Sequence, residues 1–171
     1  MKWLVLATIA AAAFACGSDD APSSPCPAND PTTDADESQC KALSTLSQGQ
    51  QSVEKRGCAG CHGADMSGST SVLVRSNVPT QTPLGEAIEL YPPNLTPDAT
   101  GIATWSDDAL ALAIRSGIDN ESQTLCPQMQ HFSTMNDYEV YSIVKYLRSL
   151  PAVSRQVPRS VCPPLKTKAQ Q

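Results

Sequence analysis

Two cysteines and a histidine form the group of side chains best suited to chemistry in this chain, in the segment Cys58-Ala59-Gly60-Cys61-His62. Two thiols three positions apart, with a histidine directly after the second, are the signature of covalent haem attachment. The thiols can add to the two vinyl groups of a haem, and the histidine then lies below the iron and supplies an axial nitrogen. The spacing therefore predicts one haem c, bound by Cys58 and Cys61, with His62 as an axial ligand.

Three alternatives use the same residues. A zinc site would need a fourth ligand, for which only His131 or another cysteine is available. A redox-active dithiol would require a strand followed by a helix, a pattern that the sequence around Cys58 lacks. A disulfide between residues three positions apart would be strained. Haem agrees better with the features described below, which are an export signal, a helical pattern and a long loop able to wrap a large ligand.

The second axial ligand must come from elsewhere, and the candidates are Met66, Met129, His131 and Met135. Met66 lies only four residues after His62, too close to reach the opposite haem face. Met135 directly precedes a predicted helix and is expected to pack there as a hydrophobic staple. Position favours Met129, in the loop between two helices, over His131. A methionine ligand would give a higher potential than a second, more basic histidine.

Three segments have the periodicity of helices that would position these ligands. The first runs from about residue 38 to residues 56–57, and its small and apolar positions recur every three or four residues at Leu43, Leu46, Gly49 and Val53. The second begins at Ser106, a good N-cap followed by two aspartates, and ends at Gly117. Its apolar face comprises Leu110, Ala113 and Ile114.

The third helix begins at Asn136, with Glu139 three residues later in a capping-box arrangement, and ends at Pro151. Its apolar stripe comprises Tyr138, Tyr141, Ile143, Val144, Tyr146, Leu147 and Leu150. Residues 63–104 are rich in Gly, Pro, Ser and Thr and are expected to form a long loop, with at most one short helix near residues 84–90. No segment has the pattern of a strong strand, so the predicted fold class is all-α.

The first 15 residues have the features of an export signal. Lys2 gives a positive start, residues 3–15 are almost all apolar, and Ala13-Phe14-Ala15 matches the small-x-small pattern that precedes a cleavage site. The apolar run is too short for a comfortable membrane-spanning helix. Cys16 follows directly, in the position of the lipid-modified first residue of a bacterial lipoprotein. We expect a lipid anchor at Cys16, and cleavage without a lipid is the alternative.

Residues 16–37 are expected to form a lipid-anchored linker, because they contain four prolines, several acidic residues and no basic residue. Such a composition buries too little apolar surface to offset the entropy lost on folding. Residues 38–151 would then form the folded domain, and residues 152–171 a C-terminal tail.

Cysteine parity supports the anchor. The chain has seven cysteines, of which two belong to the haem motif. Cys26, Cys40, Cys126 and Cys162 remain as an even set for disulfides in an oxidising compartment, which leaves Cys16 for the lipid. Cys26 and Cys40 bracket part of the linker and would form a local disulfide.

Composition narrows the choice of partners. The chain has 12 Lys and Arg against 17 Asp and Glu, without a basic stripe, so nucleic acid is not an expected partner. Aromatic residues are few, and a haem would supply core surface that they do not. No acid–base pair or nucleophile accompanies the haem motif, so the chain is not expected to be an enzyme by itself.

Together these motifs resemble the class I cytochrome c family over roughly residues 40–151, and they are similar to those of haem subunits of periplasmic dehydrogenases. The segments that carry the resemblance are Gly49-Gln50-Gln51-Ser52-Val53, Cys58-Ala59-Gly60-Cys61-His62-Gly63, Pro93-Asn94-Leu95-Thr96-Pro97-Asp98, Thr100-Gly101-Ile102, Trp105-Ser106-Asp107-Asp108, Ala113-Ile114-Arg115-Ser116-Gly117, Leu125, Pro127, Met129, Asn136-Asp137-Tyr138-Glu139 and Tyr146-Leu147-Arg148-Ser149-Leu150-Pro151. The resemblance implies the class I cytochrome c fold, in which the N- and C-terminal helices cross and a long loop wraps the haem.

The resemblance also implies roles for single residues. Met129 would be the axial sulfur ligand, and Gly49 would let the first helix cross the last one near Tyr146. The segment from Asn94 to Asp98, together with Trp105, would line the haem edge. Arg115 would bind a haem propionate, unless it is simply an exposed helical arginine.

Two departures from the family pattern lie beside Met129: Gln130 replaces the usual proline, and Cys126 is unusual. A disulfide from Cys126 to Cys162 would staple the methionine loop to the C-terminal tail and could hold the sulfur on iron. The competing connectivities are Cys26–Cys126 with Cys40–Cys162, and Cys26–Cys162 with Cys40–Cys126.

These expectations describe a membrane-tethered, monohaem one-electron carrier on the periplasmic side of a bacterial membrane, or a soluble periplasmic one if Cys16 carries no lipid. Its partners would be redox proteins that dock transiently: a dehydrogenase, an oxidase or another cytochrome. A haem-based sensor or ligand-binding protein with a labile axial methionine is the alternative from another functional class. A structural lipoprotein with an accidental motif is a third.

Overall fold

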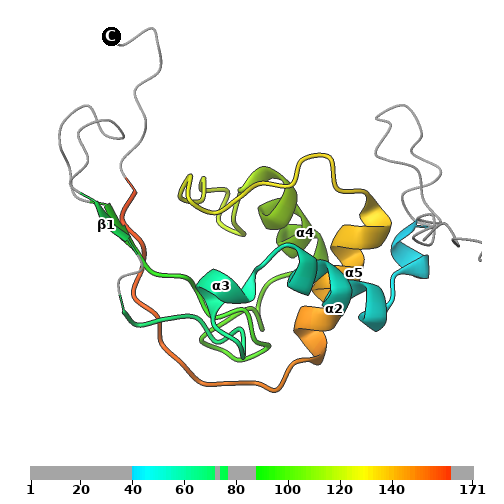
Figure 1. Cartoon of the computed structure of the whole chain (residues 1–171), viewed down its shortest axis with the longest axis horizontal. Helices are drawn as coiled ribbons and strands as arrows, with labels where there is room; N and C mark the ends of the chain where they lie inside the picture. Colours follow the sequence, from blue (N-terminus) through cyan, green and yellow to red (C-terminus); the bar gives the residue numbers. More distant parts are fainter. Residues whose placement is uncertain (1–39, 72–73, 77–87, 163–171) are drawn as a thin grey trace, which may run out of the picture.

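The fold is built mainly from helices, shown in Figure 1 for the computed structural model of the chain. The structure describes residues 40–71, 74–76 and 88–162, so the predicted signal and linker lie outside the described residues. A short helical segment at residues 40–43 precedes the elements α2 Leu46–Lys55, α3 Ala59–His62, β1 Val74–Ser76, β2 Ile88–Leu90, α4 Asp107–Ser116 and α5 Asp137–Ser149. This confirms the all-α class. Within the described residues, no helix has the length and apolar character needed to cross a membrane.

Helices α2 and α5 cross closely at Gly49. A Cβ atom built on Gly49 would lie 1.9 Å from the carbonyl oxygen of Ser142 and 2.7 Å from the Cβ atom of Tyr146. No side chain fits in that space, so glycine permits the close approach of the two backbones. The predicted crossing near Tyr146 is confirmed.

The start of the first helix differs from the prediction. The chain is helical at residues 40–43, breaks, and begins α2 after the N-cap Thr45, whose hydroxyl accepts a hydrogen bond from the backbone N–H three residues later at 3.1 Å. Leu43 lies before the break, which changes the helical phase, and is 52% exposed. Leu46 is the first residue of α2 and is 49% exposed, although seven positions separate it from the buried Val53 in the same helix. Their assignment to the apolar face is therefore wrong.

Helices α4 and α5 begin as predicted. The side chains of Ser106 and Asn136 each accept a hydrogen bond from the backbone N–H three residues later, at 3.1 Å and 2.9 Å. Gly117 ends α4 in the left-handed conformation, with φ of 66°. The Glu139 carboxylate accepts three hydrogen bonds of 2.8–3.0 Å from Arg56, which directly follows α2. This ion pair joins the end of α2 to the start of α5.

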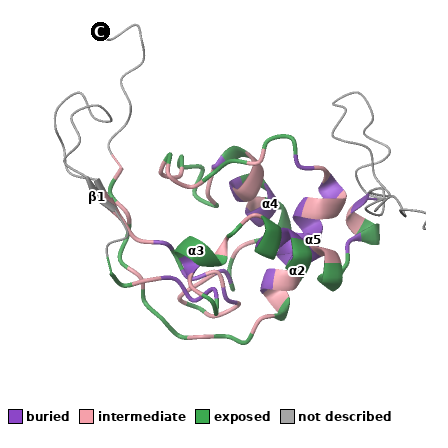
Figure 2. Cartoon of the chain, in the orientation of Figure 1, coloured by how far each residue is buried: buried purple, intermediate pink, exposed green. Residues whose placement is uncertain are grey.

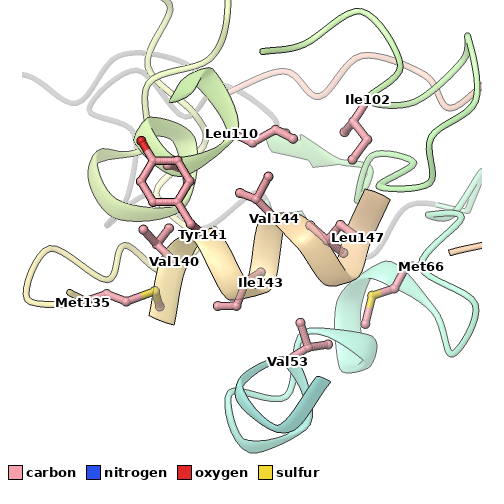
Figure 3. Packing of buried hydrophobic residues seen from close by; sticks show 11 residues of the cluster. Val53, Met66, Ile102, Leu110, Met135, Val140, Tyr141, Ile143, Val144 and Leu147 are labelled. Carbon is pink, nitrogen blue, oxygen red and sulfur yellow. The ribbon is translucent and has the colours of Figure 1, made fainter. Parts of the chain in front are cut away.

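The apolar core lies around α5, where Figure 2 shows the buried residues concentrated. Figure 3 shows side chains from α2, α4 and the loops meeting α5. The buried members of this cluster are Val53, Met66, Ile102, Leu110, Ala111, Met135, Val140, Tyr141, Ile143, Val144 and Leu147. Met135 packs beside Val140 at the start of α5, as expected of a hydrophobic staple.

A small antiparallel sheet interrupts the long loop. Strands β1 and β2 pair with Val74 opposite Leu90. On the other edge of β2, Glu89 forms an antiparallel bridge to Val161 near the end of the described chain. Segments far apart in sequence therefore meet beside β2.

The short helix expected near residues 84–90 is wrong for residues 88–90, which are β2, whereas residues 84–87 lie outside the described residues. The strands β1 and β2 have three residues each, which agrees with the expectation that no segment forms a strong strand. Pro92 and Pro93 follow β2 after Tyr91, and a proline disfavours a helical backbone at the residue before it. The extended residues then find hydrogen-bond partners on both edges, and neither partner is close in sequence.

Candidate cofactor site

Helix α3 carries the two predicted thiols. Cys58 is its N-cap and Cys61 lies in its single turn, where the Cys61 N–H donates to the Cys58 carbonyl at 3.2 Å. Positions three apart lie on one face of a helix. Burial raises the pKa of the half-buried Cys58 thiol, whereas Cys61 is exposed. Both cysteines are free, so the alternative of a disulfide between them is wrong and both thiols are available.

His62 is buried at the end of α3, with an exposed fraction of 6%. Its Nδ1 lies 3.0 Å from the carbonyl oxygen of Pro93. A carbonyl oxygen can only accept, so Nδ1 carries the hydrogen and Nε2 keeps its lone pair. Burial also lowers the pKa of the imidazole, against a smaller opposing effect of this hydrogen bond. The neutral form that a metal ligand requires is therefore favoured.

These three side chains fit a covalently bound haem. Two free thiols can form thioethers, and an imidazole held through Nδ1 presents Nε2 in a fixed direction, which is the usual arrangement of a metal-binding histidine. In the part of the chain that the structure describes, no group of three or more His, Cys, Asp or Glu residues could hold a metal ion. The zinc alternative therefore finds no ligand set there.

The loop that provides the histidine's acceptor is fixed against the chain that follows α3. The Leu95 N–H donates to the Met66 carbonyl at 2.8 Å. Gly68 has φ of +79°, and a Cβ atom there would lie 2.5 Å from the Pro92 carbonyl oxygen. Glycine is needed both for this conformation and for the close approach. The Met66 side chain packs in the apolar core.

Asn94 and Trp105 take different positions. Asn94 is 2% exposed, and its amide nitrogen donates to the Thr100 hydroxyl at 3.1 Å and to the Val153 carbonyl at 2.8 Å. Its amide oxygen accepts from the N–H and the hydroxyl of Thr96, at 2.9 Å and 2.8 Å. Asn94 thus organises the surrounding loop, whereas Trp105 packs partly buried against the core. That both residues line a haem edge stays a prediction.

Arg115 faces Asp137 at the start of α5. Its Nη2 lies 2.6 Å from the Asp137 Oδ1, and the two side chains are only 17% and 9% exposed. The ion pair joins the end of α4 to the start of α5. The alternative of an exposed helical arginine is therefore wrong, and binding of a haem propionate stays a prediction.

The loop that contains Met129 is tied by a disulfide between Cys126 and Cys162. This confirms the predicted pairing and excludes both competing connectivities. Met129 is partly buried, and its N–H donates to the Cys126 carbonyl at 2.9 Å. Cys40 is also disulfide-bonded, and its predicted partner Cys26 lies outside the described residues.

His131, the other candidate for the second axial position, packs at the end of α4. A Cβ atom on Gly117 would lie 1.9 Å from the His131 Nε2, so the imidazole ring covers this glycine. The ring's contact with α4 accounts for its placement without a metal. The choice of Met129 over His131 stays a prediction.

Two features of the site were not found from the sequence. One is the Pro93 carbonyl as partner of His62, and the other is the packing of the C-terminal tail against the Pro93 loop. Both contacts use backbone carbonyl groups, which every residue has and which therefore leave no signal in the residue types.

Similarity to known proteins agrees with this geometry. The family model described as Cytochrome c matches residues 46–151, from the start of α2 to just beyond α5. The chain is also 33% identical over 116 residues to a protein of Pseudomonas putida that is named as one of the subunits of nicotinate dehydrogenase. That alignment covers 66% of this chain and 9% of the relative, so the chain spans only a small part of the relative's length.

Proposed function

The chain belongs to the cytochrome c family, and we propose that it is a monohaem one-electron carrier on the periplasmic side of a bacterial membrane. Proteins of this family carry covalently attached haem c with iron and act in electron transfer. In the proposal, Cys58 and Cys61 hold the haem through thioether bonds. His62 and Met129 would bind its iron.

The observation that carries the proposal is the state of His62. Its Nδ1 is committed to the Pro93 carbonyl at 3.0 Å, which leaves Nε2 to bind a metal, and two free cysteines lie within the preceding four residues. A buried neutral imidazole next to two unpaired thiols has no evident role in stability. Covalent haem accounts for all three side chains at once.

When bound, the haem supplies a one-electron ferric–ferrous couple. The residues of this chain hold it and adjust it. The hydrogen bond from His62 to Pro93 fixes the ring and makes its other nitrogen a better ligand. A thioether ligand from Met129 would raise the potential relative to a histidine ligand. No acid–base group is needed for such a transfer.

The proposed partners are redox proteins that dock transiently. A relative of this chain is named as part of a dehydrogenase, which supports a dehydrogenase as the electron donor, with an oxidase or another cytochrome as acceptor. The sequence from Lys2 to Cys16 supports export and a lipid on Cys16, which would keep the carrier at a membrane. A Cys16→Ser variant that stays membrane-bound after export would contradict the anchor.

The test is expression of the full chain with the cytochrome c maturation proteins, followed by a haem stain on a denaturing gel. The wild-type chain is expected to stain, and the Cys58→Ser/Cys61→Ser variant to lose all covalent haem. His131→Ala should keep its visible spectrum, whereas Met129→Ala should lose the methionine-to-iron absorption band. Rapid carbon monoxide binding by the reduced wild-type protein would favour a ligand-binding sensor over a carrier.

A further inference from the structure

The described residues after α5 make specific contacts with other parts of the chain. Residues 152–162, which we call the C-terminal strap, leave α5 and run back past the loop beside α3 to the small sheet (Figure 1). The strap contacts segments that lie far from it in sequence, at both ends of its course.

The first contacts are with the loop that orients His62. The Val153 carbonyl accepts from the Asn94 amide at 2.8 Å, and the Val153 N–H donates to the Thr96 hydroxyl at 3.1 Å. Asn94 follows Pro93 directly, and Pro93 provides the acceptor for His62. The strap therefore binds the residue next to the group that fixes the proximal imidazole.

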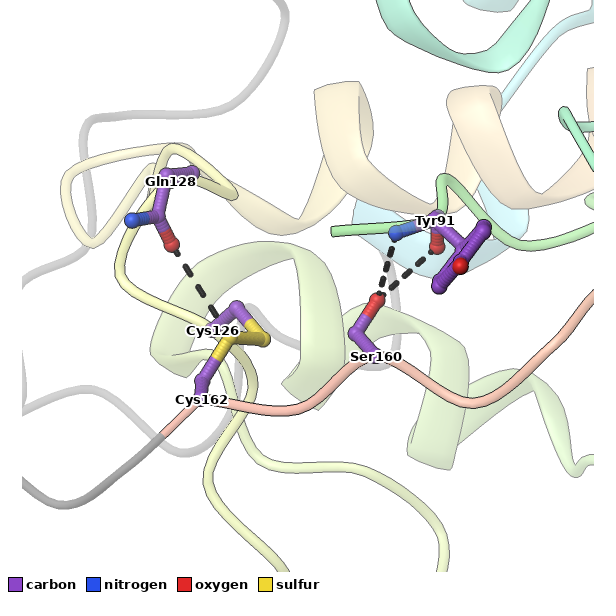
Figure 4. Close-up of a disulfide and its surroundings, with 5 residues drawn as sticks. All are labelled: Tyr91, Cys126, Gln128, Ser160 and Cys162. Atoms are coloured by element: carbon purple, nitrogen blue, oxygen red, sulfur yellow. Dashed lines mark hydrogen bonds between the residues drawn. A yellow bond between two sulfur atoms is a disulfide. The ribbon is translucent and has the colours of Figure 1, made fainter. Parts of the chain in front are cut away.

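The middle contacts continue along the same loop toward β2. The Ser160 hydroxyl accepts from the Tyr91 N–H at 2.9 Å and donates to the Tyr91 carbonyl at 3.0 Å (Figure 4). Val161 and Glu89 then exchange two backbone hydrogen bonds, at 2.8 Å and 3.2 Å. Ser160 thus satisfies both backbone groups of one residue with a single side chain.

The last contact is covalent and lies on the other loop. Cys162 is bonded to Cys126, and Figure 4 shows Gln128 against this disulfide, with its amide oxygen 4.0 Å from the Cys162 sulfur. The next residue is Met129, whose N–H donates to the Cys126 carbonyl. The continuous segment from Val153 to Cys162 thereby joins the loop behind His62 to the loop that carries Met129.

We propose that the C-terminal strap is a clamp that positions the two axial ligands relative to each other, with Cys162 and Ser160 as its positioning residues. The inference rests on the proposed function, in which His62 and Met129 bind the same iron. The loop around Pro93 and the loop around Met129, both described by the structure, are irregular at these residues, so their separation is set by tertiary contacts. The strap provides such contacts through hydrogen bonds on one side and a covalent bond on the other.

If the disulfide only stabilises the fold, its loss should give different results from those expected if the strap acts as a clamp. A disulfide that only stabilises the fold changes the free energy of unfolding and leaves the iron coordination intact. A clamp controls how often the methionine leaves the iron in the folded protein. Its loss should lower the potential and admit external ligands, because a population without the methionine bond becomes accessible.

The experiment uses the holoprotein and the double variant Cys126→Ser/Cys162→Ser, which leaves no unpaired thiol at the site. The methionine-to-iron band of the oxidised form should weaken, the midpoint potential should fall, and carbon monoxide should bind the reduced form about tenfold faster or more. Ser160→Ala should shift all three quantities in the same direction by less. Arg159→Ala is the matched control, because it lies in the strap and its 3.9 Å ion pair to Glu121 is exposed.

If the double variant does not fold, the folded wild-type holoprotein is treated with a phosphine. The phosphine reduces the disulfide to two thiols and is oxidised to a phosphine oxide, and water supplies its oxygen and the two thiol protons. Reduction should produce the same three changes, and reoxidation should reverse them. An unchanged band, potential and carbon monoxide rate in the reduced protein or the variant would overturn the clamp alone. A Met129→Ala protein with the wild-type spectrum would overturn the ligand assignment of the proposed function instead, and the clamp with it.

Discussion

Val140 of α5 and Thr96 of the loop after β2 are equally inaccessible to solvent, each with an exposed fraction of 0%, but they are held by different interactions. Val140 packs among the apolar side chains of the helical core. Thr96 donates its N–H and hydroxyl to the Asn94 side chain and accepts a hydrogen bond from the Val153 N–H. The helices are stabilised by apolar burial, and this loop by saturation of its polar groups.

The difference matches what each part has to do. Apolar burial is not directional, so it can hold α2, α4 and α5 together without fixing any single atom. Hydrogen bonds have a preferred length and angle, so a buried network of them fixes atoms in place. The hydrogen bonds of Asn94 to Thr96, Thr100 and Val153 form a buried network, which we call the loop network. The carbonyl that orients His62 belongs to Pro93, the residue before Asn94. The part of the molecule that needs a defined geometry is the part built on directional contacts.

The largest expected effect comes from filling the helix crossing. Gly49→Ala places a Cβ atom 1.9 Å from the Ser142 carbonyl oxygen, where backbone and not a flexible side chain must move. We expect the free energy of unfolding to fall by about 3 kcal/mol or more, although alanine has the higher helix propensity by about 1 kcal/mol. Guanidinium unfolding of the holoprotein, followed by circular dichroism, measures the change.

Gln50→Ala is the control for this prediction, because Gln50 is the exposed neighbour of Gly49 in the same helix. Its effect should stay within about 0.5 kcal/mol. Equal stability of Gly49→Ala and the wild-type protein would show that α2 and α5 do not approach as closely as the structure has them.

The loop network should respond less strongly but in a more specific way. Asn94→Ala removes four hydrogen bonds of 2.8–3.1 Å and leaves the partners of Asn94 unsatisfied in a buried site. We expect a loss of about 2–3 kcal/mol in the free energy of unfolding, less than the sum of four bonds because the partners can relax. Asn94→Asp keeps the accepting oxygen but replaces the donor to Val153 with a carboxylate oxygen, so it should destabilise the protein at least as much as Asn94→Ala.

The exposed Asn120→Ala variant controls for the loss of an amide and should unfold as the wild-type protein does. The visible spectrum of Asn94→Ala adds a second readout. A changed spectrum would show that the loop network affects the haem through Pro93 and His62. An unchanged spectrum would show that Asn94 affects only the stability of the fold.

Signals in the residues close to each element predicted the helices, whereas long-range contacts account for the missed strand β2. Ser106 and Gly117 mark the ends of α4 by local capping, and the crossing at Gly49 followed from the resemblance to a family. The break before α2 had a local signal as well: Thr45 and Gln48, three residues later, form a capping-box pattern that the regular spacing of leucines concealed. Strand β2 had no local signal, because its three residues become a strand only through pairing with segments elsewhere in the chain.

The features of the candidate site also divide into those predicted from residue types and those set by long-range backbone contacts, which were not predicted. The motif around His62 is contiguous, so spacing alone identified the two thiols and the imidazole. The disulfide from Cys126 to Cys162 was predicted because a cysteine is unusual beside Met129. The path of the strap to Tyr91 was not predictable, because it is set by hydrogen bonds to backbone groups.

The smallest expected effect is a pH dependence in the loop network. The Asp98 carboxylate accepts hydrogen bonds from the hydroxyl and the N–H of Thr100, at 2.6 Å and 2.8 Å, and these bonds hold the pKa of that carboxyl below its usual 3.8. A group whose pKa is lower in the folded state stabilises it above the unfolded pKa. That contribution is lost as the pH falls from 3.8 through the lower folded value. Asp98→Asn should therefore be less stable than the wild-type protein at neutral pH, and the difference should vanish in acid.

Unfolding in guanidinium at a series of pH values measures this convergence. Glu54→Gln, at an exposed position on α2, is the control for an equal change of net charge. If the difference in the free energy of unfolding between Asp98→Asn and the wild-type protein stayed constant as the pH fell, the Thr100 hydrogen bonds would not favour the charged form of Asp98. The charge of Asp98 would then contribute nothing to the stability of the loop network.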